Sequence, residues 1–325
     1  MLSDLRISHS TESLNYFAGN RTANTCRVEF RIVILGRREG SIMNSKEVVS
    51  VGSLLRDWRK RRRLSQLDLA YDAEISQRHL SFLEIGRSQP SREMILRLAE
   101  QLDIPLRERN VLLTAAGFAA VFPERPLDDA SLAPARKAVD LILNRLEPNP
   151  TFAVDRRWTL IAANRAADIF TSEVDPSLLE PPINMLRICL HPKGFTPQVI
   201  NYPAWRRNIL EYLHKQVEST ADAFLADLLQ ELKSYPTPKF WKRDSQIKEI
   251  DYSGFAIPLR LMTKEGELSF ISTVTVFGTP IDVTVSELAI ETFFPADENT
   301  AAILRRASTE AAKGRSQMEI VSAHG

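Results

Sequence analysis

Residues 65–87, SQLDLAYDAEISQRHLSFLEIGR, contain two short helical patterns separated by a three-residue break, and they decide the fold of the N-terminal part of the chain. Ser65 is followed three residues later by Asp68, which is the capping-box signature of a helix start. A short helix, a tight turn and a second short helix form a helix-turn-helix, whose second helix enters the major groove of DNA.

The inner and outer faces of the two helices follow from helical periodicity. At about 100° per residue, Leu80 and Leu83 lie on the inner face of the second helix. We expect Leu67 and Ala70 of the first helix to pack against them. The outer face of the second helix is left with polar and apolar side chains, namely Arg78, Ser81, Phe82 and Ile85.

Three further helices flank this pair. An apolar side predicts a helix over residues 51–62, and apolar spacing at i, i+3, i+4 and i+7 predicts another that begins at Ser91. A fifth helix is expected from Pro105 to Gly117. Five helices in so short a segment predict a compact all-α domain.

The runs LSQxxLA, ISxxxLSxLExG and RxxPS, in this order within residues 64–91, resemble the lambda-repressor-like (Xre) helix-turn-helix family. The resemblance covers residues 51–117. It implies a five-helix lambda-repressor-like domain that binds a double-stranded DNA operator as a two-fold homodimer.

Base contacts are expected from the outer face of the second helix. Gln77 suits adenine and Arg78 suits guanine, while Ser81 can reach either kind of base. Phe82 has two interpretations of equal weight: it contacts a thymine methyl group, or it is covered by the fourth helix or a partner subunit.

Phosphate contacts are assigned separately, because they set affinity rather than sequence choice. The family pattern implies that Gln66 contacts a phosphate, and Arg87, Arg61 and Arg63 are further candidates. The same resemblance implies a structural ion pair between Arg59 and Glu84.

Composition limits the remaining classes. With 325 residues, 44% hydrophobic and 26% charged, the chain is expected to form two or three globular domains, and its basic excess lies in residues 46–117. Cys26 and Cys189 lack any disulfide or zinc spacing, so no metal or cofactor is expected. No apolar run has membrane-spanning length, which predicts a cytoplasmic protein without a membrane partner.

The rest of the chain divides by composition. We expect residues 1–45 to be a disordered extension, or to precede a true start of translation at Met43. The DNA-binding domain takes residues 46–120, a Pro-rich linker takes 121–134, and a C-terminal tail takes 298–325.

Residues 135–297 carry a mixed pattern. Two short strands are expected within 151–164, helices over 165–170, 183–190, 204–217 and 221–233, and strands over 255–262, 268–277 and 281–294. This order predicts an α+β domain with an antiparallel sheet and helices over one sheet face.

A second resemblance rests on NP at 149–150, DRRW at 155–158, ANRAA at 163–167, NMLR at 184–187 and LHP at 190–192. Asn201, WR at 205–206 and FW at 240–241 follow in the same order. These motifs are similar to the MmyB-like ligand-binding domain over residues 147–294. That family accompanies Xre-type domains in bacterial regulators, and the resemblance implies a PAS-like fold.

The resemblance also implies a pocket between sheet and helices for a small apolar, fatty-acid-like ligand. Candidate pocket residues are Trp158, Asn164, Met185, Arg187, His191, Phe255 and Phe277. The polar residues at the family's motif positions have an alternative interpretation, in which they cap helices and satisfy loop backbone.

Catalysis is not expected, because the sequence lacks HExxH, GxSxG and phosphate-cradling glycine loops. The sequence therefore predicts a ligand-responsive DNA-binding transcription regulator. The alternative is a DNA-binding repressor whose C-terminal domain binds a protein partner, as an antitoxin does.

Overall fold

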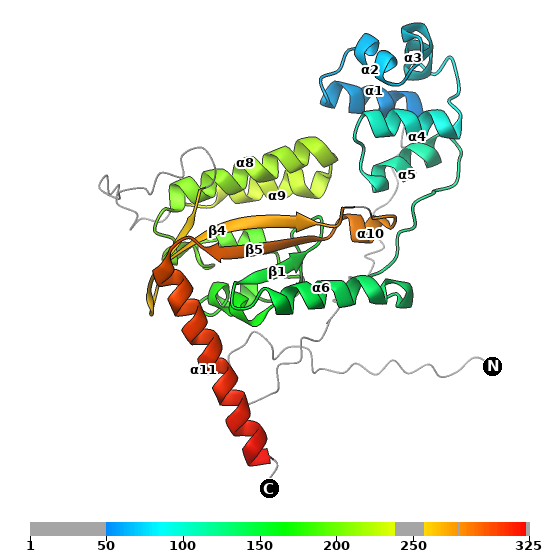
Figure 1. Ribbon diagram of the computed structural model, residues 1–325. Helices are drawn as coiled ribbons and strands as arrows, with labels where there is room; N and C mark the ends of the chain where they lie inside the picture. Colours follow the sequence, from blue (N-terminus) through cyan, green and yellow to red (C-terminus); the bar gives the residue numbers. More distant parts are fainter. Residues whose placement is uncertain (1–49, 238–256, 279, 323–325) are drawn as a thin grey trace, which may run out of the picture.

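The computed structural model describes residues 50–237, 257–278 and 280–322, with side chains described up to residue 310. The expected extension over residues 1–45 lies outside the described residues. Two bodies are visible in Figure 1, a small helical domain and a larger α+β domain.

The helical domain contains the five predicted helices: α1 (Val51–Arg61), α2 (Gln66–Asp72), α3 (Gln77–Glu84), α4 (Arg92–Gln101) and α5 (Leu106–Ala115). Each of the first four begins at a serine, and the hydroxyl accepts the backbone N–H three residues ahead: Ser50, Ser65, Ser76 and Ser91. Each such cap stabilises its helix by about 1 kcal/mol. The boundaries are therefore encoded locally, and for this reason the sequence predicts them well.

One prediction about the core is wrong. Leu67 does not pack inward: it is 60% exposed, on the same side of α2 as the exposed Tyr71. The residues of α2 and its C-cap that face the core are Leu69, Ala70 and Ala73. The helix is thus rotated so that positions i, i+1 and i+4 face inward, and Leu80 and Leu83 of α3 meet this set.

The packing of α1 on α3 is unusually close at one glycine. A Cβ atom added to Gly52 would lie 2.2 Å from the carbonyl oxygen of Leu83 and 2.9 Å from that of Glu84. The sequence pattern gave no reason to single out Gly52. Only a residue without a side chain allows the two helix backbones to approach in this way.

The larger domain is built on a five-stranded antiparallel sheet with the order β2-β1-β5-β4-β3. Its strands are β1 (Thr151–Val154), β2 (Leu160–Ala163), β3 (Leu259–Thr263), β4 (Gly266–Val276) and β5 (Ala289–Pro295). The α+β class and the antiparallel sheet are as predicted.

Helices cover both faces of this sheet, rather than the single face that was expected. On one face lie α7 (Met185–Leu190), α8 (Tyr202–Thr220) and α9 (Ala223–Ser234), and they share the largest hydrophobic core with the sheet. The helix α6 (Ala133–Arg145) lies on the opposite face, where Val139 and Leu143 contact Ile290 (Figure 1). Short 3-10 helices complete the connections: η2 (Ala130–Leu132), η3 (Arg165–Phe170), η4 (Pro176–Leu178) and η5 (Thr196–Gln198).

The strand expected over residues 281–294 is in fact a helix followed by a strand. Asp282 accepts the backbone N–H of Thr284 and so begins the short helix α10 (Val283–Ser286), after which β5 starts. Two hydrogen bonds fasten α10 to the linker: the N–H of Val283 donates to the Pro123 carbonyl, and the Thr284 hydroxyl donates to the Arg125 carbonyl. Apolar alternation alone does not reveal this tertiary anchoring.

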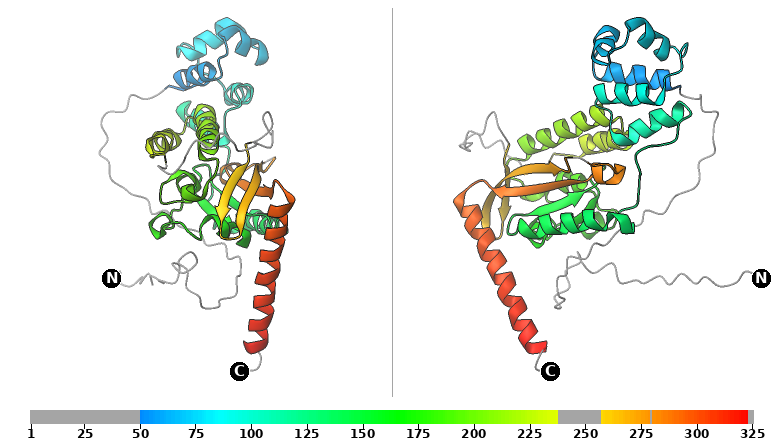
Figure 2. Two further views of the ribbon diagram at one scale, coloured as in Figure 1. Left: turned by 90° about the vertical axis from the view of Figure 1, so that its left-hand side faces the viewer. Right: turned by 45° about the vertical axis from the view of Figure 1, so that its right-hand side comes forward.

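The residues after the domain, expected only as a tail, form the helix α11 (Glu298–Ser322). Its first turns belong to the domain, because Ile303 and Leu304 are buried in the main core and Thr300 accepts the N–H of Ser269. Beyond these turns the helix runs away from the body of the molecule (Figure 2).

Candidate DNA-reading surface and ligand-binding domain

The recognition helix α3 lies on the side of the helical domain that faces away from the sheet (Figure 1). Gln77 and Arg78, both predicted to read bases, are exposed in its first turn. Ser81 and Phe82 are half-buried on the same outer side. The structure therefore brings the four predicted base-contacting residues onto one accessible surface.

Phe82 lies between two arginines. The guanidinium carbon of Arg78 is 5.3 Å from the centre of the Phe82 ring, and that of Arg87 is 5.9 Å away. Cation–π contacts at such exposed sites are worth about 0.5–1 kcal/mol each. Neither interpretation offered from the sequence, a thymine contact or a cover by another helix, included this arrangement, although Arg at i and Phe at i+4 is a readable helical pair.

The turn after α3 places the second of these arginines. Gly86 adopts a left-handed φ of 75°, and the N–H of Arg87 donates to the carbonyl of Phe82 at 2.8 Å. This is the Schellman pattern of helix termination, which favours glycine at the left-handed position. The turn at Gly86 therefore places Arg87 on the side of α3 that carries Phe82.

Arg59, Glu84 and Gln66 form a buried polar group beneath the recognition helix. Arg59 Nε lies 2.6 Å and Nη2 2.9 Å from the two carboxylate oxygens of Glu84, and Gln66 Nε2 donates to the same carboxylate at 2.8 Å. Burial raises the pKa of Glu84, but hydrogen bonds from Arg59 and Gln66 outweigh it, so the pKa lies below its ordinary value. The group fixes α1, α2 and α3 to one another, and Gln66 keeps a second N–H for another acceptor.

The other predicted phosphate contacts lie in two places. Arg87 and Arg63 are exposed, and Arg63 has a left-handed φ of 58° just after α1. Arg61 instead faces the larger domain, where its Nη1 donates to the carbonyls of Val217 and Glu218 at 3.3 Å.

Arg62 makes the same kind of contact between domains. Its Nη2 donates to the carbonyl of Ser219 at 3.3 Å, while Nε donates to that of Leu102 within the helical domain. Carbonyls at a helix C-terminus lack helical partners and carry partial negative charge, so they attract arginines. Two arginines of α1 and its C-cap thus hold the end of α8.

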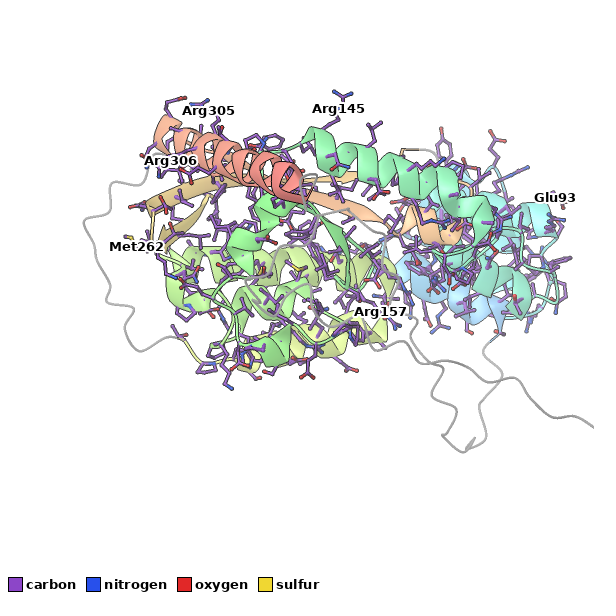
Figure 3. All side chains as sticks on the ribbon, turned by 90° about the horizontal axis from the view of Figure 1, so that it is seen from below. Glu93, Arg145, Arg157, Met262, Arg305 and Arg306 are labelled. Carbon is purple, nitrogen blue, oxygen red and sulfur yellow. The ribbon has the colours of Figure 1, made fainter. Side chains whose placement is uncertain are left out.

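A second junction joins α5 to the start of β5. Arg107 forms a two-pronged ion pair with Glu287, with Nε–Oε1 at 2.7 Å and Nη2–Oε2 at 2.9 Å, and also contacts Glu124 of the linker. Arg156, after β1, lies 3.8 Å from Glu287 and 3.0 Å from Asp222 at the start of α9. The guanidinium of Arg157, labelled in Figure 3 beside this junction, lies over the ring of Phe224 at 4.9 Å.

A cleft of about 670 Å³ runs along this junction. Its walls are α5 on one side, with Glu108, Asn110 and Thr114, and the turn between α8 and α9 on the other. Burial raises the pKa of the Glu108 carboxyl, although the charges of Arg156 and Arg107 oppose the shift.

The predicted ligand-pocket residues lie in several places, although Arg187 and His191 are brought together: Glu231 bonds both Arg187 and Tyr235, and the Tyr235 ring meets that of His191 at 4.9 Å. Trp158 and Met185 are buried in the main core. Phe277 packs in the cluster on the α6 face of the sheet, and Phe255 lies outside the described residues. His191 caps α7, where its Nδ1 accepts the N–H of Lys193.

Asn164 and Arg187 have structural partners. The Asn164 side chain accepts the N–H groups of Thr151 and Ala167, and its amide donates to the carbonyl of Asn149 at 2.8 Å. Arg187 forms a two-pronged, half-exposed ion pair with Glu231, both distances being 2.8 Å. These contacts match the alternative in which motif residues cap helices and hold loops.

Sequence reasoning missed one functional candidate in this domain. Glu291, on the central strand β5, is half-buried on the sheet face that carries Phe293, and loss of solvation raises its pKa to about 7. The signal was present, since Glu291 sits in the alternating run AIETFF at a position of inward register with Phe293.

In the part of the chain that the structure describes, no three or more His, Cys, Asp or Glu side chains are grouped to hold a metal ion. None of the described helices is both long and apolar enough to cross a bilayer.

An exposed recognition helix on a five-helix domain, joined by arginine contacts to an α+β domain, defines a two-domain DNA-binding regulator. The sequence matches the MmyB-like transcription regulator ligand binding domain over residues 135–307 and the helix-turn-helix family over residues 55–109. The chain belongs to the family of regulators with an MmyB-like ligand-binding domain. A search of curated proteins found no match.

Solved structures align with parts of the chain. The restriction-modification controller protein C.AhdI from Aeromonas hydrophila is 35% identical over 19% of this chain and 96% of its own, with a TM-score of 0.18. The clp gene regulator ClgR from C. glutamicum is 24% identical over 23% of this chain and 92% of its own, with a TM-score of 0.19. An RNA-binding Light-Oxygen-Voltage receptor is 11% identical over 81% of this chain and 64% of its own, with a TM-score of 0.22.

Proposed function

We propose that this regulator binds its operator as a homodimer through α3, and that a small amphipathic ligand in the α+β domain controls the DNA-bound state. The observation that carries the first part is the outer surface of α3, where Arg78 and Gln77 are exposed and Phe82 lies between Arg78 and Arg87. A guanidinium restrained before binding loses less entropy when it meets a base or a phosphate.

In this proposal Arg78 donates to guanine, Gln77 to adenine, and Ser81 contacts a neighbouring base edge. Arg87 and Gln66 contact phosphates, with Arg63 as a further phosphate contact. Phe82 serves as the surface on which Arg78 and Arg87 rest, so its contribution to base choice is indirect.

Control by the ligand uses the two junctions between the domains. Arg61 and Arg62 hold the end of α8, and Arg107 holds Glu287 just before β5. A ligand that shifts α8 or the start of β5 therefore changes the position of the DNA-binding domain. In a dimer this changes the spacing of the two recognition helices, which must match half-sites about one helical turn apart.

The DNA-binding proposal is tested by footprinting and titration on the operator and on random DNA at fixed salt. Arg78→Ala should cost about 1–3 kcal/mol at the operator and relax one base position, whereas Gln66→Ala should weaken binding to all sequences. Arg145→Ala, which removes an exposed arginine of α6 (Figure 3), is the matched charge control and should change neither. Equal losses on operator and random DNA for Arg78→Ala would contradict a base-reading role.

Native mass spectrometry of the purified protein separates ligand control from the alternative of a protein partner. A bound small molecule and a dimer mass support the proposal. An empty α+β domain together with a stoichiometric bound protein would favour the antitoxin-like alternative.

A further inference from the structure

The strand β4 is much longer than the strand that lies along its outer edge. β3 pairs with β4 only from Gly266 to Phe270, whereas β5 pairs with it as far as Val276. If the register of β3 continued, Ile257 would pair with Ser272, but no bridge forms between them. Among the described residues, the last part of β4 therefore has a neighbouring strand on one side only. We call residues 272–276, STVTV, the open edge of β4.

The hydrogen bonds of β3 show which backbone groups point outward from the open edge. The N–H of Arg260 donates to the Asn201 side chain, and its carbonyl accepts the N–H of Ile200, so both groups face away from β4. Because these groups alternate along a strand, Leu261 and Leu268 form a hydrogen-bonded pair between β3 and β4. Every second residue of β4 after Leu268 points its N–H and C=O the same way, and within the open edge these residues are Ser272, Val274 and Val276.

The residues between them face β5 instead. The carbonyl of Ser269 accepts the N–H of Ala296, which directly follows β5, and Ser269 has the same parity as Thr273 and Thr275. Within the described chain, no strand or side chain bonds the outward N–H and C=O groups of the open edge.

Both faces of the sheet are accessible at the open edge. Val274 is 39% and Val276 61% exposed on the face that carries α8, and Thr273 and Thr275 are exposed on the opposite face. The open edge contains no charged residue and no proline, which are the usual protections of a strand edge against pairing. An accessible, unprotected edge with β-branched side chains is a template for a further strand.

A second copy of the chain fits the open edge about a two-fold axis. Residues directly opposite each other in an antiparallel pair share a sheet face, so only residues of equal parity can pair across the axis. With the axis at Val274, this residue meets its own copy and Ser272 meets Val276, so all the outward groups are bonded. An axis at Thr273 would leave Val276 unpaired, because the outward groups of Phe270 already bond Leu259.

We infer that the open edge of β4 pairs with the open edge of a second copy, antiparallel and centred on Val274, so that two five-stranded sheets join into one. The contact is isologous and therefore closes on two copies. Thr273 of each copy lies opposite Thr275 of the other, and such Thr–Thr pairs stabilise a sheet. This inference rests on the proposed homodimer and names its interface.

The same axis suits operator binding. A two-fold axis that pairs two strands antiparallel is perpendicular to their sheet, so the helices α7 and α8 of both copies lie on the same side of the joined sheet. Arg61 and Arg62 attach the DNA-binding domain to the end of α8. Both DNA-binding domains are therefore carried on one side of the dimer, as the reading of two half-sites on one duplex requires.

Sedimentation equilibrium of the full chain tests the interface. Val274→Lys places two like charges opposite each other at the axis and should raise the dimer Kd at least about tenfold. Met262→Lys is the matched control, because Met262 is a 54% exposed apolar residue of β3 (Figure 3). It should leave the Kd unchanged. Circular dichroism should show the same fold for both variants and the wild type, since both side chains reach solvent.

A pair of cysteines tests the register. Opposed positions that are not hydrogen-bonded to each other have Cα atoms about 4.5 Å apart, which a disulfide can span. Oxidation of a mixture of Thr273→Cys and Thr275→Cys chains should therefore give covalent dimers. Each variant alone should give none, because its own two cysteines lie two positions out of register. The wild type, with Cys26 and Cys189, supplies the background.

A dimer Kd unchanged by Val274→Lys overturns this interface and leaves the homodimer standing. Cross-linking of either cysteine variant alone to the same extent as the mixture does the same. A wild type that stays monomeric with and without operator DNA overturns both the interface and the homodimer, and the open edge then belongs to another strand. The DNA titrations with Arg78→Ala are independent of these results, so failure of the base-reading proposal is recognised separately.

Discussion

Two glutamates, Glu84 buried and Glu291 half-buried, distinguish the domains of this protein. In the DNA-binding domain, Glu84 receives two hydrogen bonds from Arg59 and one from Gln66, and its pKa is lowered despite burial. In the ligand-binding domain, Glu291 has a hydrogen bond from Ser272 and no ionic partner among the described residues, and burial raises its pKa. The fold therefore gives one glutamate a cationic partner and gives the other none among the described residues.

This difference separates a structural carboxylate from a functional candidate. A partnered buried charge fixes the geometry of its neighbours and has no capacity left for a ligand. A carboxyl without a counter-ion does not fix its neighbours in this way, and its ionisation is disfavoured instead. Glu84 thus fixes the helices beneath the reading surface of the DNA-binding domain. In the ligand-binding domain, Glu291 has no comparable ionic partner among the described residues.

The largest effect on stability is expected when the partner of Glu84 is removed. Arg59→Met should destabilise the DNA-binding domain by about 3–5 kcal/mol, because it leaves a buried carboxylate without its cation. Urea unfolding followed by hydrogen exchange in α1–α5 measures the loss. The double variant Arg59→Met with Glu84→Leu should recover most of it, and a loss below about 1 kcal/mol for Arg59→Met alone would contradict the structural role.

Glu291→Gln should act in the opposite direction. Because the folded pKa of about 7 lies above the ordinary 4.5, ionisation of Glu291 reduces the free energy of unfolding as the pH rises through this window, by about 3 kcal/mol in full. At pH 8 the variant should therefore be more stable than the wild type by up to this amount. At pH 5 the difference should shrink below about 1 kcal/mol.

Thermal unfolding of both proteins from pH 5 to 8, without added ligand, measures this difference. A gap that is constant with pH would show that Glu291 does not titrate in this window. Glu211→Gln, at an exposed carboxylate of α8, serves as the control, and its stability should follow that of the wild type throughout.

The rigidity of the DNA-binding domain is tested at Gly52. Gly52→Ala would place a methyl group 2.2 Å from the Leu83 carbonyl oxygen, so α1 and α3 must separate. We expect a loss of about 1–3 kcal/mol in domain stability and weaker binding to operator DNA. The affinity for dodecanoate, a fatty-acid-like probe, measured by calorimetric titration should stay unchanged, and a parallel loss of ligand binding would show that the domains do not respond independently.

The smallest effect is expected at Arg187, which the sequence placed in the ligand pocket. Its ion pair with Glu231 is half-exposed, so Arg187→Ala should change stability by less than about 1 kcal/mol. Ligand affinity measured by the same titration should not change. A large loss of dodecanoate binding in this variant would restore Arg187 to the ligand site.

Local signals explain how much of the fold the sequence predicted. The serine caps, the glycine turn after α3 and the 3.6-residue periodicity each act within a few residues, so all five helices of the DNA-binding domain were expected. Leu67 was misplaced because two overlapping helical faces fit the same short pattern. Gly52 was missed because its close contact lies more than thirty residues away in the chain.

Long-range contacts form the ligand-binding domain. The sequence therefore predicted its helices and strands better than its candidate site. Asn164 and Arg187, both at motif positions, hold the backbone and a partner side chain, and a motif alone does not distinguish such contacts from ligand contact. The run from 281 to 294 alternates like one strand, yet bonds to the linker turn its first part into α10. The alternating run AIETFF already placed Glu291 on the same face as Phe293, and the sheet register adds its neighbours Phe152 and Val274.

The contact of Arg61 with α8 has a thermodynamic consequence. The Nη1 group that donates to Val217 and Glu218 cannot at the same time donate those hydrogens to a phosphate. On the expectation that Arg61 also contacts a phosphate, DNA and the ligand-binding domain compete for its Nη1 hydrogens, and the competition is reciprocal: whatever free energy the α8 contact subtracts from DNA affinity, DNA subtracts from that contact. In that case the α8 contact and operator binding are linked through a shared donor, without any requirement that either domain change its fold.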